Sequence, residues 1–185
     1  MGQLLITFIM LTSFTVLAQD QKTYQLLTEQ SNINWKGSYS FLFSEHNGTV
    51  DFKNGNLITT NGNITGGTFV VDMTTISNEE YLAGIGPVGH IRNEDFFDVE
   101  KFPEAVLEIT SVEFFINENR HKMLADLTIK GITKSVEFWP EIDETNKRML
   151  VKFKIDRTRW EITYNNKLKN EAISDAIEFQ CILQF

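Results

Sequence analysis

Apolar and polar residues alternate along most of this chain with a period of two, which is typical of half-buried β-strands. In the clearest stretch, Val151, Phe153 and Ile155 share one side of a strand, while Lys152 and Lys154 occupy the other. A slip of one residue would reverse these sides, so the register of such a strand is strongly specified. The same pattern predicts further strands at residues 24–28, 33–37, 48–52, 68–73, 106–116, 123–130, 133–141 and 177–185.

Tight turns separate the predicted strands. Asn54-Gly55 and Asn61-Gly62 are dipeptides that favour positive φ in two-residue hairpin turns, and Lys130 to Lys134 predicts a tight turn around its glycine. Eight or nine short strands joined in this way predict an antiparallel barrel or sandwich. The interior of an eight-stranded barrel can be filled by side chains or can hold one small ligand, and alternation alone does not distinguish the two.

The alternation stops between Gly89 and Pro103, in the run GHIRNEDFFDVEKFP. This run brings one His, one Arg, four acidic residues and three Phe together between two strand-rich halves. Acidic residues ahead of Tyr81 and Leu82 also resemble a helix start, and several glycines then interrupt any long helix. The residues alone therefore predict a loop with a short helical turn that closes a core with Phe96, Phe97 and Phe102.

Ionisable residues in the same run offer two interpretations. His90 with Arg92, Asp95 and Asp98 can form a polar cluster, because Arg binds a carboxylate through two hydrogen bonds and a nearby acid favours His protonation. The alternative is an ion-pair network that only orders the loop. The sequence leaves both open.

The first eighteen residues contain no charged side chain and are apolar from Leu4 to Leu17. The run is short for a membrane span, and Val16 and Ala18 place small residues where a signal peptidase cuts before Gln19. We therefore expect residues 1–18 to be a signal peptide, residues 19–185 to form one domain, and the protein to be periplasmic or secreted.

Composition excludes some classes of partner and bond. The formal net charge of −8 lies entirely after residue 18, which disfavours a polyanion such as nucleic acid. Cys181 is the single cysteine, so no disulfide within the chain is available, and its place in an alternating apolar row predicts a buried small hydrophobe.

No strong catalytic or metal-binding motif accompanies these features. The three histidines, His46, His90 and His121, lack the local spacing of a helix-borne zinc site, and no G-x-S-x-G motif is present. Arg157 and Arg159 can stack a cation on Trp160 or bind an anionic headgroup, with salt bridges at the barrel rim as the simpler reading. We expect no metal and no cofactor.

With these motifs, the chain resembles the YceI-like, lipocalin-like family of exported bacterial proteins. The run from Gly89 to Pro103 is similar to the family signature HLKSxDFFDVxKYP, and four other segments agree in order with family motifs. The four segments are His46 to Val50, Gly66 to Met73, Leu127 to Lys134 and Ile155 to Trp160. Departures from the family pattern include Ile91 in place of Leu, Asn93 in place of Ser and a Gly- and Pro-rich stretch at 83–88.

The resemblance implies an elongated eight-stranded antiparallel lipocalin-like barrel, with a short helical or loop insertion around 78–100. It further implies a non-catalytic protein that holds a long isoprenoid chain, polyprenyl or quinone-like, for transport or storage. Transient membrane contact and a dimer are compatible with this function. The residues expected to bind the lipid are Trp35, Phe52, Phe69, Val71, Phe97, Leu107, Ile109, Phe138, Val151 and Phe153, with His46, His90 and Arg92 near an end of the barrel.

Two other functions remain open at this stage. One is an enzyme that uses His90 with Asp95 or Asp98 as acid and base on a lipid or quinone. The other is a stress-related interaction module with a solid core, which would show no continuous apolar cavity. The identity of the ligand, its headgroup, the oligomeric state and the delivery partner are not encoded in any motif that the sequence displays.

Overall fold

The computed structural model describes residues 19–39, 45–78, 88–94, 96–163 and 173–185. The expected signal peptide at 1–18 and most of the expected helix start near Tyr81 lie outside these residues. The described elements are β1 (Gln21–Gln25), η1 (Thr28–Gln30), β2 (Asn32–Tyr39), β3 (Glu45–Thr60), β4 (Asn63–Ser77), α2 (Val88–Arg92), β5 (Glu104–Phe115), β6 (Arg120–Ile129), β7 (Ile132–Phe138), β8 (Glu141–Asp143), β9 (Arg148–Asp156), η2 (Arg157–Trp160) and β10 (Ile173–Gln184).

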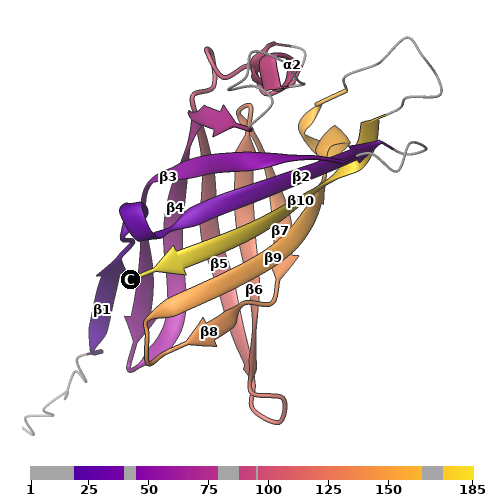
Figure 1. The fold of residues 1–185 in the computed structure, drawn as a ribbon. Helices are drawn as coiled ribbons and strands as arrows, with labels where there is room; N and C mark the ends of the chain where they lie inside the picture. Colours follow the sequence, from indigo (N-terminus) through magenta and orange to yellow (C-terminus); the bar gives the residue numbers. More distant parts are fainter. Residues whose placement is uncertain (1–18, 40–44, 79–87, 95, 164–172) are drawn as a thin grey trace, which may run out of the picture.

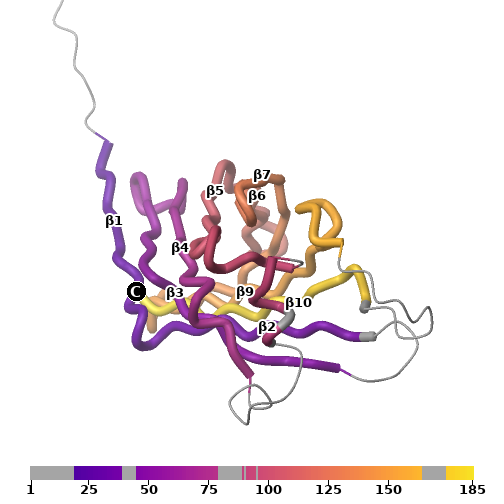
Figure 2. The backbone as a smooth tube through the Cα atoms, turned by 90° about the horizontal axis from the view of Figure 1, so that it is seen from above, coloured from indigo at the N-terminus to yellow at the C-terminus, as the bar shows by residue number. Residues whose placement is uncertain are grey.

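All strand pairs in the described residues are antiparallel and belong to one sheet in the order β7-β6-β5-β4-β3-β2-β10-β9-β8, with β1 paired to β3 at the side (Figure 1). The predicted all-β antiparallel fold is thus confirmed. The sheet has ten strands rather than eight, because β1 forms a short separate strand and Pro140 separates β7 from the three-residue β8. Seen from above, the sheet curls around an interior (Figure 2).

The curled sheet is not closed by backbone hydrogen bonds: among the described residues, no ladder joins β7 to β9. Side chains close this seam instead. The indole Nε1 of Trp160, in η2 after β9, donates to the carbonyl oxygen of Leu127 in β6 at 3.1 Å, and Arg159 donates to the carbonyl oxygen of Ser135 in β7 at 3.1 Å. Phe138 of β7 also packs against Phe153 of β9, with ring centroids 5.9 Å apart.

One predicted turn is wrong. Asn54-Gly55 lies inside β3, which continues unbroken from Glu45 to Thr60 and contains a bulge between Phe52 and Asn54 where its pairing with β4 shifts. A Cβ at Gly55 would lie 2.6 Å from the ring of Phe69. The glycine therefore serves close packing across the strands rather than a change of chain direction.

Other predicted turns are confirmed. Asn61 and Gly62 join β3 to β4 with φ of 52° and 83°, and Lys130 and Gly131 join β6 to β7 with φ of 51° and 74°. Positive φ at both central residues gives the turn twist that matches paired antiparallel strands. The long hairpins, and with them the strand register, follow from these dipeptides.

Candidate functional site

A cavity of about 210 Å³ lies inside the curled sheet. The apolar positions of the alternating strands face it, and no Asp, Glu, Lys or Arg side chain lines it among the described residues. A completely filled interior, as the solid-cored module would require, is therefore excluded. Part of the interior is nevertheless solid, because Met123 and Ala125 on β6 are fully buried outside the cavity lining.

All ten apolar residues that the sequence pointed to line this cavity, and so does His46. His90 lies in α2, and its side chain is not described. Arg92, at the end of the same helix, does not belong to the cavity lining. Several lining residues were not singled out from the sequence, although most of them stand in the predicted alternating rows. These are Ile33, Val50, Met73, Ile76, Ala105, Leu127, Ile129, Met149, Ile177, Phe179, Cys181 and Leu183.

The segment from Gly89 to Pro103 forms α2 followed by hydrogen-bonded turns, and it covers one end of the cavity. Phe96 and Phe97 are each 5% exposed, line the cavity and meet edge to face with ring centroids 4.9 Å apart. Backbone hydrogen bonds from Phe97 to the Ile91 carbonyl (3.1 Å) and from Val99 to the Arg92 carbonyl (3.0 Å) fold the turns onto the helix. The segment therefore acts as a self-supported apolar cap.

Arg92 fastens this cap to the sheet. Its Nη1 donates to the carbonyl oxygens of Thr74 at 2.6 Å and Ile76 at 3.2 Å, both on β4. Hydrogen bonds from a charged donor are stronger than neutral ones, so these two contacts hold α2 firmly over the strand end. Of the two interpretations drawn from the sequence, these two hydrogen bonds of Arg92 favour ordering of the loop.

The turn between β6 and β7 supports the cap from the other side. Lys130 Nζ donates to the carbonyl oxygen of Glu94 at 3.2 Å, and a Cβ at Gly131 would lie 3.4 Å from the ring of Phe102. Phe102 therefore packs outside the cavity, against this turn, rather than as part of the lining. Two segments that carried separate sequence motifs are neighbours in space.

The groups of the catalytic alternative are only partly described. Asp95 lies outside the described residues, and the side chain of His90 is not described. Asp98 is half-buried with a φ of 51°, and it does not line the cavity. In the part of the chain that the structure describes, no group of three His, Cys, Asp or Glu side chains is placed to hold a metal ion.

Polar side chains line the cavity mainly at one end, which sequence reasoning found only in part. Ser38 near the end of β2, His46 at the start of β3 and Ser174 at the start of β10 all border it. Gly37 is paired with both His46 and Ile177, so these three strands are neighbours there. Ser174 faces inward because pairing shifts between Ile173 and Ile177, a bulge that simple alternation does not predict.

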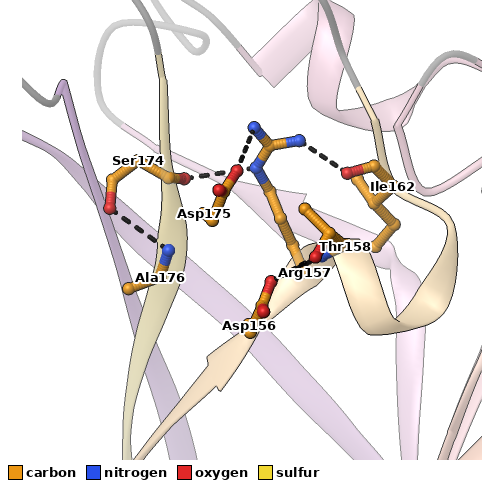
Figure 3. A network of polar contacts seen from close by, with 7 residues as sticks. All are labelled: Asp156, Arg157, Thr158, Ile162, Ser174, Asp175 and Ala176. Carbon is orange, nitrogen blue, oxygen red and sulfur yellow. Dashed lines mark hydrogen bonds and ion pairs between the residues drawn. The ribbon is translucent and has the colours of Figure 1, made fainter.

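Arg157 anchors the strand that carries Ser174 (Figure 3). It is 4% exposed, and it donates to the carbonyl oxygens of Ile162 (2.5 Å) and Ser174 (3.2 Å) and to the carboxylate of Asp175 (3.0 Å). At the start of η2, Asp156 accepts hydrogen bonds from the Thr158 hydroxyl and amide, and the hydroxyl contact is the main cause of its lowered pKa.

Substitutions in this network should have unequal effects. Arg157→Ala removes the donor that binds two backbone carbonyl oxygens, so we expect the free energy of unfolding to fall by about 2–3 kcal/mol. Asp175→Asn should cost less than about 1 kcal/mol, because the Asp175 side chain is 66% exposed and its charge is screened. Urea denaturation of both variants checks this order, and equal losses would contradict it.

Cys181 lines the cavity and is buried, and desolvation raises the pKa of its thiol to about 12 from an ordinary value of 9.0. The unfolded chain releases this proton first. We therefore expect the contribution of the buried, protonated Cys181 thiol to folding stability to be complete below about pH 9. That contribution should disappear between about pH 9 and about pH 12. Urea unfolding across this range, compared with Cys181→Ala, isolates the effect, because other alkaline titrations remain in the variant. Parallel pH profiles would refute it.

No helix in the described ranges is long and apolar enough to cross a membrane.

Comparisons with known proteins agree on one family. Residues 24–185 match the model of the YceI-like domain. A segment of 47 residues is 40% identical to UPF0312 protein plu2095 of Photorhabdus laumondii, and this match spans 25% of the chain but 23% of that relative. The chain thus aligns with about a quarter of the length of this curated protein.

A solved structure shares this fold. The crystal structure of BcnA from Burkholderia cenocepacia superposes with a TM-score of 0.69 at 13% identity, over 85% of this chain and 98% of BcnA. The YCEI protein of Campylobacter jejuni gives a TM-score of 0.47 at 15% identity, with 98% of each chain covered. At these identities the likeness to BcnA is evidence about architecture alone.

Proposed function

The chain belongs to the family of YceI-like domains, and from this premise we propose that it binds the hydrocarbon chain of a long isoprenoid lipid inside its cavity. The YceI-like fold is generally a binding-protein fold. The single observation that carries the proposal is the continuous apolar lining of the cavity, from Ile33 and Phe69 to Phe97 and Phe153.

The physical basis is hydrophobic transfer. Each methylene group moved from water into an apolar environment contributes about 0.8 kcal/mol, so a few isoprene units supply ample affinity without a charged contact. The cavity walls are built from aromatic rings and branched aliphatic side chains on rigid paired strands. Such a site selects its ligand chiefly by length and shape.

The proposed setting is outside the cytoplasm. The uncharged apolar run at 1–18 favours export, so the lipid would be carried or stored in the periplasm or in the medium. A carrier of this kind loads and releases its ligand at membranes by transient contact. Its net charge of −8 favours solubility between such contacts.

Extraction of the purified protein tests the proposal. We expect organic extracts of protein prepared from its native compartment to contain an isoprenoid by mass spectrometry, and native mass spectra to show a stoichiometric adduct. Delipidated protein should then take up an added polyprenol. Protein that is repeatedly empty and takes up no isoprenoid would contradict the proposal.

The catalytic alternative has no specific observation in its favour. Of its three named groups, Asp98 lies away from the cavity lining and the other two side chains are not described. A His90→Ala variant that binds lipid normally but loses a measured turnover would establish catalysis.

A further inference from the structure

The polar end of the cavity carries information about the ligand's headgroup. The three polar side chains there, Ser38, His46 and Ser174, project from neighbouring strands into a lining that is otherwise almost entirely apolar. Each is only half-buried, unlike the apolar walls. A lipid in the cavity therefore meets hydrogen-bonding groups at one end and hydrocarbon at the other.

Gly37 leaves room beside these groups. It stands on the inward side of β2, in line with Ile33 and Trp35, and it lines the cavity. A Cβ built at this glycine meets no atom of the described residues within 4 Å. Among the described residues, space therefore remains beside Gly37, under the cap, for part of a headgroup.

In the described ranges, two cations near this end are already paired with carboxylates. Lys36, next to Gly37, pairs with the carboxylate of Glu45 at 2.8 Å. Arg157, which binds the Ser174 backbone, pairs with Asp175 at 3.0 Å. A phosphate head requires charge-assisted donors to offset its desolvation, whereas the polar side chains that line the cavity among the described residues are two hydroxyls and an imidazole.

We infer that Ser38, His46 and Ser174 receive a neutral headgroup, a hydroxyl or a carbonyl, and thereby orient the isoprenoid in the cavity. Serine hydroxyls both donate and accept, and a neutral imidazole can do both. Ser174 Oγ already accepts from the Ala176 amide at 3.1 Å, and its hydroxyl hydrogen can still donate to either head. The inference rests on the proposed function, because it assigns the head of a lipid whose chain occupies the apolar part.

Three probes that differ in their heads test the inference on the delipidated full-length protein: geranylgeraniol, geranylgeranyl diphosphate and the headless isoprenoid squalene. We expect the alcohol to bind more tightly than the other two. His46→Leu and the double variant Ser38→Ala/Ser174→Ala should each weaken the alcohol about tenfold, the loss expected for a buried hydrogen bond. Squalene binding should stay unchanged in both.

Matched controls separate this effect from a general loss of structure. His121→Leu removes a histidine that stacks on Phe114 away from the cavity, and Ser111→Ala removes an exposed serine on β5. Both controls should retain the preference for the alcohol. Because the serine variant changes little volume, it remains informative if His46→Leu fails to fold.

The possible outcomes distinguish the two proposals. If the diphosphate binds as tightly as the alcohol, or if alcohol and squalene bind equally, the neutral polar end is refuted while isoprenoid binding stands. If none of the three probes binds, the proposed function fails and this inference fails with it.

Discussion

Replacing Leu107 with Trp is expected to abolish lipid uptake while leaving the protein folded. Leu107 lies on β5 opposite Phe69 and projects into the cavity, so the larger indole occupies space that the ligand needs. A ligand that cannot enter the cavity loses all of its apolar contacts with the walls. We therefore expect the affinity for a polyprenol to fall at least about a hundredfold. Native mass spectrometry after lipid loading measures the loss.

The matched control is Leu124→Trp. Leu124 is 36% exposed on β6 and does not line the cavity, so the same change in volume falls outside the site. Binding should survive this substitution, and urea denaturation should give both variants stability near that of the parent protein. Undiminished lipid uptake by a folded Leu107→Trp variant would show that the ligand does not occupy this cavity.

Replacing Trp160 with Ala is expected to cause the largest loss of stability of any single change considered. Its side chain is fully buried, and its indole donates to the Leu127 carbonyl oxygen across the seam. Removing it leaves a large void and takes one hydrogen-bond donor from the Leu127 carbonyl oxygen, for which we expect a loss of about 3–5 kcal/mol. Chemical denaturation monitored by circular dichroism measures the change.

Trp139 provides the comparison for this residue. It is half-buried and packs against the ring of Phe115, and the Arg120 guanidinium lies over its own ring. Its Nε1 donates to the carboxylate of exposed Glu137. Trp139→Ala should therefore cost only about 1 kcal/mol. Comparable losses for the two tryptophans would mean that Trp160 does not contribute to closing the sheet.

The strands were predictable because burial on one face forces alternation. Val151, Phe153 and Ile155 show the same parity in the sequence and in the structure, as do Leu107 and Ile109. Asn54-Gly55 misled because the dipeptide is compatible both with a hairpin turn and with close packing under Phe69. Only the contact across β3 and β4 decides between them.

The candidate site was predictable only where inward and outward residues alternate regularly along a strand. Phe69 and Val151 could be placed inside from their rows, but Ser174 faces inward through a bulge and Ser38 lies at a strand end where parity weakens. The hollow interior was not readable from alternation at all. Whether side chains fill a barrel depends on the curvature of the sheet and on which volumes meet across it.

The seam between β7 and β9 has a consequence for the thickness of the ligand. In a barrel closed by a continuous ladder, strand number and stagger together fix the diameter. Here the distance between β7 and β9 depends instead on the contact of Phe138 with Phe153 and on the hydrogen bonds from Trp160 and Arg159. Widening the sheet at that side would separate the two phenylalanine rings and break the two side-chain hydrogen bonds while every strand ladder stays intact. We therefore expect these four side chains to limit the cross-section of the ligand.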